Sequence, residues 1–387
     1  MKKVAVLTFH RANNYGAVLQ AHALTNVINK LGAEAEILDY RPAKAERFYH
    51  SLIPRAKKLK LFCALLHHRY LRDGRTYRAF AAFRRNVMKI SSQVYTSPAE
   101  LRRSNELYDL FIAGSDQIWN PDIVGVGGKS GDCSYLLDFV ESSSKKNSYA
   151  ASIGVSVLRE DVCRVYREKL SDFATITVRE HRAAEVLESL LNRPVGVVCD
   201  PVLLLSDEEW KSFERPYPLR SADYILVYSV GGKMDLLPYA RDLAKSEGCA
   251  VYTIQPPIVG TVSDDSSQAL SGVGPAEFVW LIRHARAVVT TSFHGSAFSL
   301  LFRKTLHVLQ ENKRKASHRN SRFDSLFRYF GICPCNLEEF ITPDGLVKIV
   351  SPDTHDMKHL ETSKQHSMQI LFNILNKTNK PFPLSSK

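Results

Sequence analysis

Short apolar runs alternate along the chain with segments in which apolar residues recur at helical spacing. The run VAVLTF (4–9) is followed by a polar turn and then by AVLQAHALTNVINKL (17–31), whose apolar positions repeat every three or four residues. Further apolar runs of strand length are AEILDY, DLFIAGSD, KKNSYAASIG, ATITVRE, VGVVCD, DYILVYSV, AVYTIQP, AVVTTSF and TLHVL. Because strands that alternate with helices build parallel sheets covered by helices, the pattern predicts an α/β fold.

The alternation is interrupted once, by the segment ERPYPLRSA (214–222), which has two prolines and no apolar periodicity. We interpret it as a linker, since 387 residues are too many for one ordinary domain. We therefore expect two Rossmann-like domains that face each other across a cleft, over 1–213 and 222–350, followed by a C-terminal helix and tail over 351–387. Ligands of such sheets bind beyond the carboxyl ends of the strands.

The composition is that of a soluble globular protein, with 44% hydrophobic and 24% charged residues. The first apolar run is too short for a signal peptide, and no apolar stretch is long enough to span a bilayer. The seven cysteines form no CxxC pair, and we expect Cys333 and Cys335 to be two surface thiols. These features favour a reducing, cytoplasmic environment.

The positive charge of the chain is concentrated in one insertion. Residues 41–90 contain fourteen Lys and Arg against two acidic residues, so this segment carries the whole net charge of +12. Aromatic residues are interleaved with the basic ones. Such a segment could bind RNA, lie on an anionic membrane face, or form a solvated helical insertion whose aromatic residues pack beneath it.

Polar residues gather at the predicted carboxyl ends of the strands, in HRANNYG, GSDQIWN, ASIG, VRE and SFHG. Such gathering is what a cleft site requires, and it makes His294, directly before Gly295, a candidate catalytic residue rather than a core or capping histidine. The chain has no GxGxxG at its first helix, no HExxH and no acidic cluster at metal-binding spacing. We therefore expect neither a nicotinamide cofactor nor a metal.

Several strings, taken together and in this order, resemble the polysaccharide pyruvyl transferase family. The strings are NNYGAVLQAHAL (13–24), DLFIAGSDQIWNPD (109–122), SYAASIG (148–154), ITVRE (176–180), CDPVLLL (199–205), GPAEFVWLIRHARAVVTTSFHGSAFSLLFRK (274–304) and NSRFDSL (320–326). The resemblance covers roughly 1–40 and 91–332, and leaves out the basic insertion and the C-terminal residues.

The resemblance implies a fold similar to that of two-domain GT-B glycosyltransferases. It also implies a reaction, in which pyruvate passes from phosphoenolpyruvate to two hydroxyls of a sugar, a cyclic ketal forms and phosphate is released. The acceptor would be a cell-surface polysaccharide such as an exopolysaccharide, or its lipid-linked precursor, and no cofactor beyond the donor substrate would be needed. The domain over 1–213 would bind the acceptor and that over 222–350 the phosphoenolpyruvate.

For the donor, the resemblance implies that His294 is the central active-site residue and that Arg179 helps to hold phosphoenolpyruvate. Many members have an arginine two residues before the histidine, where this chain has Ser292. The donor carries a carboxylate and a phosphate, so its site needs cations and free N–H groups. From this requirement we expect donor contacts from the turn at Ser292 and Gly295, and positive charge from Arg322, which we favour, or from Arg303 or Lys304.

Histidine suits proton transfer near neutral pH, and we expect His294 to act as the general acid that protonates the donor. Asp116 could accept a proton from a sugar hydroxyl, although a turn or capping aspartate is an equal alternative. Amide and aromatic side chains at the strand ends suit sugar recognition. The expected acceptor contacts are Asn14, Tyr15, Gly16, Ser115, Trp119 and Asn120.

Two other functions remain open at this stage. A nucleotide-sugar glycosyltransferase of the GT-B kind would share the fold and the acceptor class. An RNA-binding protein would use the basic segment, but no recognition-module signature accompanies it, and we expect no nucleic-acid partner. A lipid-linked acceptor would give the segment over 41–90 a use in docking to anionic lipid, which would place a cytoplasmic protein peripherally at the inner face of the membrane.

Overall fold

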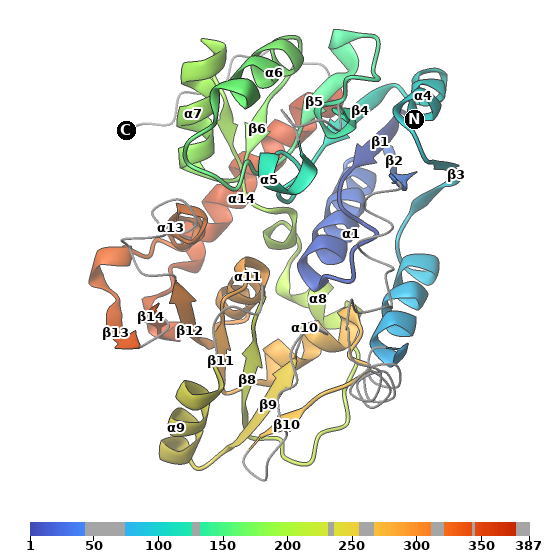
Figure 1. Ribbon diagram of the computed structural model, residues 1–387. Coiled ribbons are helices and arrows are strands. Elements are labelled where there is room, and N and C mark those ends of the chain that lie inside the picture. Colours follow the sequence, from blue (N-terminus) through green and yellow to red (C-terminus); the bar gives the residue numbers. More distant parts are fainter. Residues whose placement is uncertain are drawn as a thin grey trace, which may run out of the picture.

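The computed structural model of the protein contains two β-sheets with parallel cores, one in each half of the chain (Figure 1). The structure describes residues 1–42, 74–125, 132–230, 236–254, 267–310, 321–342 and 345–376. Both halves follow the strand–helix alternation predicted from the sequence. The fold class is therefore confirmed as α/β with two Rossmann-like units.

The first sheet has the strand order β3-β2-β1-β4-β5 and is parallel throughout. Its strands are β1 (Lys3–Leu7), β2 (Glu34–Tyr40), β3 (Ile90–Tyr95), β4 (Leu110–Ala113) and β5 (Lys146–Ser148). A two-stranded parallel sheet of β6 (Thr177–Val178) and β7 (Gly196–Val197) continues beside it through isolated bridges. The helices of this half are α1 (Tyr15–Lys30), α4 (Pro98–Leu101), α5 (Pro121–Val124), α6 (Glu160–Leu170) and α7 (His181–Leu191), with 3-10 turns η1 (Arg102–Glu106), η2 (Ser134–Leu136), η3 (Ser143–Lys145) and η4 (Pro201–Leu203).

Strand β1 is apolar at every position from Val4 to Leu7 because both faces of the sheet are covered. Val4 and Val6 pack in one cluster with α1, whereas Ala5 and Leu7 pack in a second cluster with α6 and α7. Asn14 caps the start of α1, where its side chain accepts a hydrogen bond from the Ala17 amide at 3.2 Å. The polar turn between β1 and α1 therefore lies at the carboxyl edge of the sheet.

The second sheet has the order β10-β9-β8-β11-β12-β14-β13. Its strands are β8 (Tyr224–Tyr228), β9 (Ala250–Ile254), β10 (Gln268–Ala269), β11 (Ala287–Thr290), β12 (Thr305–Gln310), β13 (Glu338–Thr342) and β14 (Gly345–Val350). Helices α10 (Pro275–His284), α11 (Phe293–Leu301) and α13 (Ser321–Tyr329) contribute to the cluster on one face, and α9 (Leu237–Glu247) to the cluster on the other. The 3-10 turns of this half are η5 (Pro334–Asn336) and η6 (Pro352–Thr354).

Two features of the second half were not predicted. Strands β13 and β14 form an antiparallel hairpin at the sheet edge, which the strand–helix alternation did not indicate. Cys333 and Cys335, expected as two surface thiols, are joined by a disulfide bond. Proximity in a CxC sequence allows both states, so the spacing alone could not separate them.

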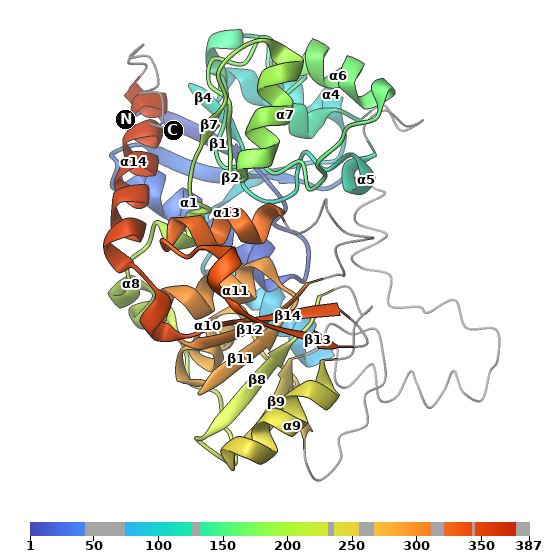
Figure 2. The same ribbon diagram turned by 90° about the vertical axis from the view of Figure 1, so that its left-hand side faces the viewer.

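Two further helices tie the halves together. Helix α8 (Asp207–Phe213) precedes the predicted linker, and α14 (Met357–Asn376) runs back along the first unit (Figure 2). The Ser367 hydroxyl of α14 accepts a hydrogen bond from the Cys199 amide at 2.9 Å, and Lys2 donates to the carbonyl of Leu375 at 2.5 Å. Among the described residues, none of the helices has the length and apolar character needed to cross a membrane.

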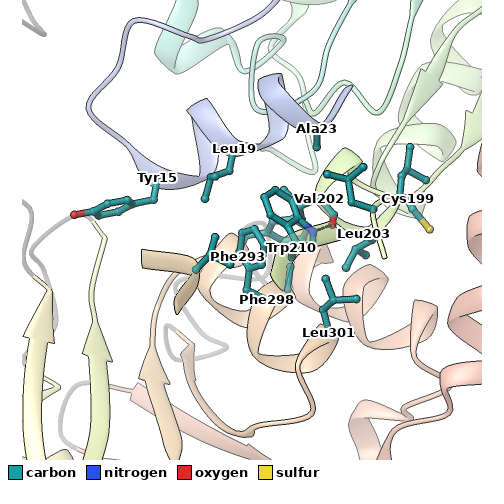
Figure 3. Packing of buried hydrophobic residues seen from close by; sticks show 14 of the residues in the cluster. Tyr15, Leu19, Ala23, Cys199, Val202, Leu203, Trp210, Phe293, Phe298 and Leu301 are labelled. Atoms are coloured by element: carbon teal, nitrogen blue, oxygen red, sulfur yellow. Dashed lines mark hydrogen bonds between the residues drawn. The ribbon is translucent and has the colours of Figure 1, made fainter. Parts of the chain in front are cut away.

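One apolar cluster runs through the boundary between the two halves (Figure 3). Side chains of α1 point toward α11, and Trp210 of α8 lies among them. The Tyr15 ring stacks on Phe278 with ring centroids 4.3 Å apart, and its hydroxyl donates to the carbonyl of Val273 at 2.9 Å. The boundary is therefore packed like a protein interior rather than held by a few surface contacts.

Most of the basic insertion, over 43–73, lies outside the described residues. Its last part forms a helix over 74–86 that packs on α1. Phe80 and Phe83 are buried, and their rings contact Tyr15 and His22 at centroid distances of 4.9 and 5.9 Å. For these two residues, the interpretation that the aromatic side chains pack beneath the insertion is confirmed.

Candidate active site

His294 lies in the first turn of α11, directly after β11, at the carboxyl edge of the second sheet. The residue that caps the helix is Ser292, whose hydroxyl accepts a hydrogen bond from the Gly295 amide at 3.2 Å. The imidazole is only 6% exposed, and its Nε2 atom lies 3.4 Å from Oδ2 of Asp200. His294 is therefore neither a capping residue nor sealed in apolar packing, because it faces a carboxylate.

Asp200 is the partner of His294, and the sequence did not single it out. It is fully buried at the start of η4, where Oδ1 accepts a hydrogen bond from the Val202 amide at 3.1 Å. Its Oδ2 atom accepts from Nη1 of Arg179 at 2.9 Å. Burial alone would raise the pKa of this carboxyl, but the imidazole and the guanidinium outweigh burial and hold the pKa well below its usual range. Asp200 therefore stays ionised and links the two basic groups.

Arg179 follows β6 and is 2% exposed. Its Nε atom donates to Glu180 at 2.9 Å, and Nη2 lies 3.8 Å from Asp116. Burial would lower the pKa of the guanidinium, but Glu180 and Asp200 raise it above its ordinary value. The structure thus directs Arg179 at protein carboxylates. Its Nη2 atom lies beyond hydrogen-bond distance of Asp116, and the contact with the donor that the resemblance implies stays a prediction.

The guanidinium of Arg179 also crosses the boundary between the halves. Its central carbon lies 4.2 Å from the centre of the Phe293 ring, the residue next to His294. An arginine over an aromatic face is attracted by the ring electrons. One cation of the first unit is thereby fixed against the helix start of the second unit.

The turn after β4 is held by a network of buried polar groups. The Ser115 amide donates to Oε1 of Gln20 at 3.1 Å, and Nε2 of Gln20 donates to the Thr8 hydroxyl at 2.9 Å. The Ser115 hydroxyl lies 3.1 Å from Oδ2 of Asp200. A Cβ on Gly114 would lie 1.9 Å from the carbonyl oxygen of Tyr149, so only glycine fits there. The network fixes the turn beside Asp200.

Asp116 comes next in this turn, with a φ of 73°. Its Oδ1 accepts a hydrogen bond from the Gln117 amide at 2.8 Å, which is the pattern of a turn aspartate. Its side chain keeps 16% of its surface exposed. The turn role is therefore present in the structure, and a proton-accepting role for Asp116 stays a prediction.

The structure corrects two of the expected acceptor contacts. Trp119 is fully buried, and its indole N–H donates to the carbonyl of Tyr135 at 2.8 Å, so its ring has no open face for a sugar. Tyr15 packs between the two halves, as described above. Asn14 caps α1, and Asn120 caps α5, where its side chain accepts from the Asp122 amide at 3.0 Å. A sequence pattern places such residues at a strand end but does not say which way they point.

The structure places some of the expected donor contacts beside His294 and others away from it. Gly295 and Ser292 lie beside His294 in the first turn of α11. Lys304 instead follows the far end of that helix, where burial and Arg283 lower its pKa, and we withdraw its assignment to the donor site. Arg322 lies in the first turn of α13, a helix that packs against α11 and α7. Among these two cations, only Arg322 stays a candidate.

Gly16 brings α1 against the catalytic candidate. A Cβ on Gly16 would lie 2.0 Å from Nδ1 of His294, where no side-chain carbon can be accommodated. Only glycine lets the backbone of the first half approach the imidazole of the second this closely. Gly16, which we expected to contact the acceptor, thus contacts the imidazole of His294.

The arrangement is suited to proton transfer. A buried carboxylate held by an arginine stands next to an imidazole whose Nε2 atom makes no hydrogen bond of good geometry within the described part of the chain. An imidazole can give and take a proton near neutral pH, and a carboxylate partner orients the ring and stabilises its charged form. The site can therefore supply one proton to a molecule bound between the two halves.

The fold is a two-domain α/β fold of the GT-B architectural type. The protein described as a UDP-N-acetylglucosamine 2-epimerase of Listeria monocytogenes is similar in fold, with a TM-score of 0.50 at 11% identity over 98% of both chains. Two further solved structures have lower TM-scores. The UDP-N-acetylglucosamine 2-epimerase of Neisseria meningitidis has a TM-score of 0.47 at 11% identity, covering 98% of this chain and 100% of that one, and the heptosyltransferase II of E. coli a TM-score of 0.38 at 13% identity, covering 97% and 99%.

The sequence itself gives the finer assignment. The profile of the family described as polysaccharide pyruvyl transferase matches residues 14–310, and the chain belongs to this family. The resemblance drawn from the motifs is thereby confirmed. A search of curated proteins finds no match. The family indicates a transferase that acts in polysaccharide pyruvylation, with a glycan as acceptor.

Proposed function

We propose that the protein transfers pyruvate from phosphoenolpyruvate to two hydroxyls of a sugar in a cell-surface polysaccharide or its lipid-linked precursor, forming a cyclic ketal and releasing phosphate. Family membership supports the reaction class. The observation that carries the proposal is the placement of the imidazole of His294 between the two halves, 3.4 Å from a buried carboxylate that Arg179 also binds.

The chemistry begins with proton transfer to carbon. His294, protonated, gives its proton to the methylene carbon of phosphoenolpyruvate, which becomes a methyl group and leaves positive character on the carbon that bears the phosphate. A sugar hydroxyl adds to that carbon and loses its proton to the neutral imidazole. The imidazolium gives that proton to the phosphate oxygen as the C–O bond to phosphate breaks, and a second hydroxyl closes the ketal and loses its proton to the imidazole. His294 is thus acid and base in turn, two roles that an imidazole side chain can fill.

Asp200 would hold the imidazole in the orientation that this step needs. A buried carboxylate favours the imidazolium form and compensates the charge when the proton arrives. His294 and Arg179 together keep that carboxylate ionised, so the contribution of Arg179 in this proposal is electrostatic and acts through Asp200. We assign the acceptor to the edge of the first sheet near Asp116, whose side chain is partly exposed.

The basic insertion would bring the protein to its acceptor. We propose that the segment over 41–90, with its net charge of +12, docks a protein of the cytoplasm to anionic lipid or to the diphosphate of a lipid carrier. Sedimentation with phosphatidylglycerol-containing vesicles at low salt tests this step. We expect binding that is weakened on deletion of 43–73, which removes eight of the fourteen basic residues of the segment; equal binding without these residues would reject this step.

The reaction is tested by incubating the protein with phosphoenolpyruvate and a panel of aryl hexosides, with phosphate release and the ketal methyl resonance as readouts. A nucleotide sugar in place of phosphoenolpyruvate tests the glycosyltransferase alternative. His294→Ala should lose more than nine-tenths of the rate and remain folded. The matched control is His307→Ala, which alters another buried histidine of the second sheet, one that is bonded to Tyr239. Turnover with a nucleotide sugar alone, or full activity of His294→Ala, would contradict the proposal.

A further inference from the structure

Gln310, the last residue of β12, carries a buried amide that the site described above does not use. The residue is 4% exposed, and its Nε2 atom has no hydrogen-bond partner among the described residues. A buried amide donor left without a partner costs about 1–3 kcal/mol. A protein therefore gains stability by replacing such a group unless a ligand uses it.

The alternation along β12 shows which way this side chain points. Leu306 and Val308 belong to the cluster that contains the buried face of α11, whereas Leu309 belongs to the cluster of α9 on the other face. Side chains two residues apart in a strand lie on the same face of a sheet. Gln310 therefore faces the side of the sheet that α11 covers.

The register of the sheet shows which end of α11 lies next to Gln310. Val308 of β12 pairs with Thr290 of β11, so Gln310 lies two positions further along, level with Ser292. Ser292 is the cap of α11, and His294 lies in the first turn of the same helix. The unpaired amide of Gln310 and the imidazole of His294 thus belong to the same end of α11.

The start of α11 offers further donors. An α-helix leaves its first N–H groups without partners inside the helix. The Ser292 hydroxyl accepts from the Gly295 amide and the Ser292 amide donates to the Thr290 hydroxyl, which leaves, among the described residues, the N–H groups of Phe293 and His294. Open N–H groups and the positive end of the helix dipole favour an anion.

We propose that Gln310 binds the donor, as a hydrogen-bond donor to an anionic oxygen held at the start of α11. The inference rests on the proposed function and names the group recognised, a phosphoryl or carboxylate oxygen of phosphoenolpyruvate. A neutral ligand would leave the helix end uncompensated, and two of the three nitrogen atoms of the Arg179 guanidinium are already bonded to carboxylates. Gln310 thus contributes an uncharged hydrogen bond to the anionic donor, in addition to the attraction from the helix end.

The test compares Gln310→Leu and Gln310→Glu with the unaltered protein by calorimetric titration of phosphoenolpyruvate, inorganic phosphate and pyruvate. Loss of one neutral hydrogen bond should weaken binding roughly 2- to 10-fold in Gln310→Leu. Gln310→Glu places a negative charge against the anion and should weaken binding further. The weakening should be seen with phosphate if the phosphoryl group is bound, and with pyruvate if the carboxylate is.

Thermal denaturation separates this role from a structural one. Gln310→Leu removes a buried unpaired donor, so it should melt at or above the temperature of the unaltered protein while binding the donor less tightly. A structural glutamine would give the reverse, a lower melting temperature with unchanged affinity, and that result would overturn the inference. His307→Leu, on the same strand but facing away with its ring bonded to Tyr239, is the matched control and should keep its affinity.

The two levels of the hypothesis fail in different ways. If the unaltered protein binds phosphoenolpyruvate and Gln310→Leu binds it equally well, the role of Gln310 is wrong and the proposed function stands. If the unaltered protein binds neither phosphoenolpyruvate nor phosphate, the proposed function fails as well.

Discussion

Gly16→Ala tests whether the two halves meet at the imidazole of His294. The added Cβ would lie 2.0, 2.4 and 2.8 Å from the Nδ1, Cγ and Cε1 atoms of the ring. The nearest approach is 1.4 Å inside the 3.4 Å at which ordinary contact begins, so the ring or the start of α1 must move by about that amount. Displacement of about 1 Å at a reacting group can lower a rate about 100-fold.

Two opposing terms determine how Gly16→Ala changes the stability of the protein, namely helix propensity and overpacking. Alanine in place of a helical glycine normally stabilises by roughly 0.5–1 kcal/mol, whereas overpacking a buried site costs about 1–3 kcal/mol. We therefore expect Gly16→Ala to unfold at lower denaturant concentration than the unaltered protein and to release phosphate from phosphoenolpyruvate at a rate lower by a factor of about 100.

Gly74→Ala supplies the control, because Gly74 is also helical and a Cβ there meets nothing within 4 Å. This variant should be slightly more stable and fully active. If Gly16→Ala behaved in the same way, the ring would not rest on α1, and the site between the halves would be refuted.

Three further predictions follow from the buried polar groups. Asp200→Asn deprives Arg179 of a carboxylate partner and should lower the free energy of unfolding by about 3–5 kcal/mol, as measured in urea; unchanged stability would show that the pair is not buried. The pKa values of Asp200 and Asp39 are both lowered in the folded chain by basic partners, which are His294 and Arg179 for Asp200 and His10 and Arg41 for Asp39. Their stabilisation is therefore complete above the unfolded value near 4 and should be lost progressively as the pH falls below it, so equal urea midpoints at pH 6 and pH 3 would argue against both pairs. Trp119→Phe removes a buried hydrogen bond to Tyr135 and should lower the melting temperature without altering the KM for the acceptor, whereas a raised KM with unchanged melting would restore the sugar-stacking role.

The sequence was sufficient for the order of elements and for the neighbourhood of His294. The apolar run of β11, the small residues after it and Gly295 are local signals, and local signals determine where a strand ends and a helix begins. The antiparallel hairpin of β13 and β14 escaped prediction because its pairing depends on the free edge beside β12.

Contacts between distant segments could not be predicted in the same way. Asp200 stands before a proline and looks like a turn residue, and its only signal was its place in the string CDPVLLL. Its role appears once folding brings it to Arg179 and His294, far away in sequence. The predicted acceptor contact of Trp119 was wrong for a related reason. A position at a strand end predicts that a residue is near the cleft, but not whether its ring faces the solvent or the core.

A crystal structure of the protein with phosphoenolpyruvate bound would measure the distance from the donor's methylene carbon to Nε2 of His294. The proposed mechanism predicts that this carbon lies within about 3.5 Å of the ring nitrogen, with an anionic group of the donor at the start of α11. Phosphoenolpyruvate bound elsewhere, with its methylene carbon out of reach of the imidazole, would contradict the assignment of proton transfer to His294.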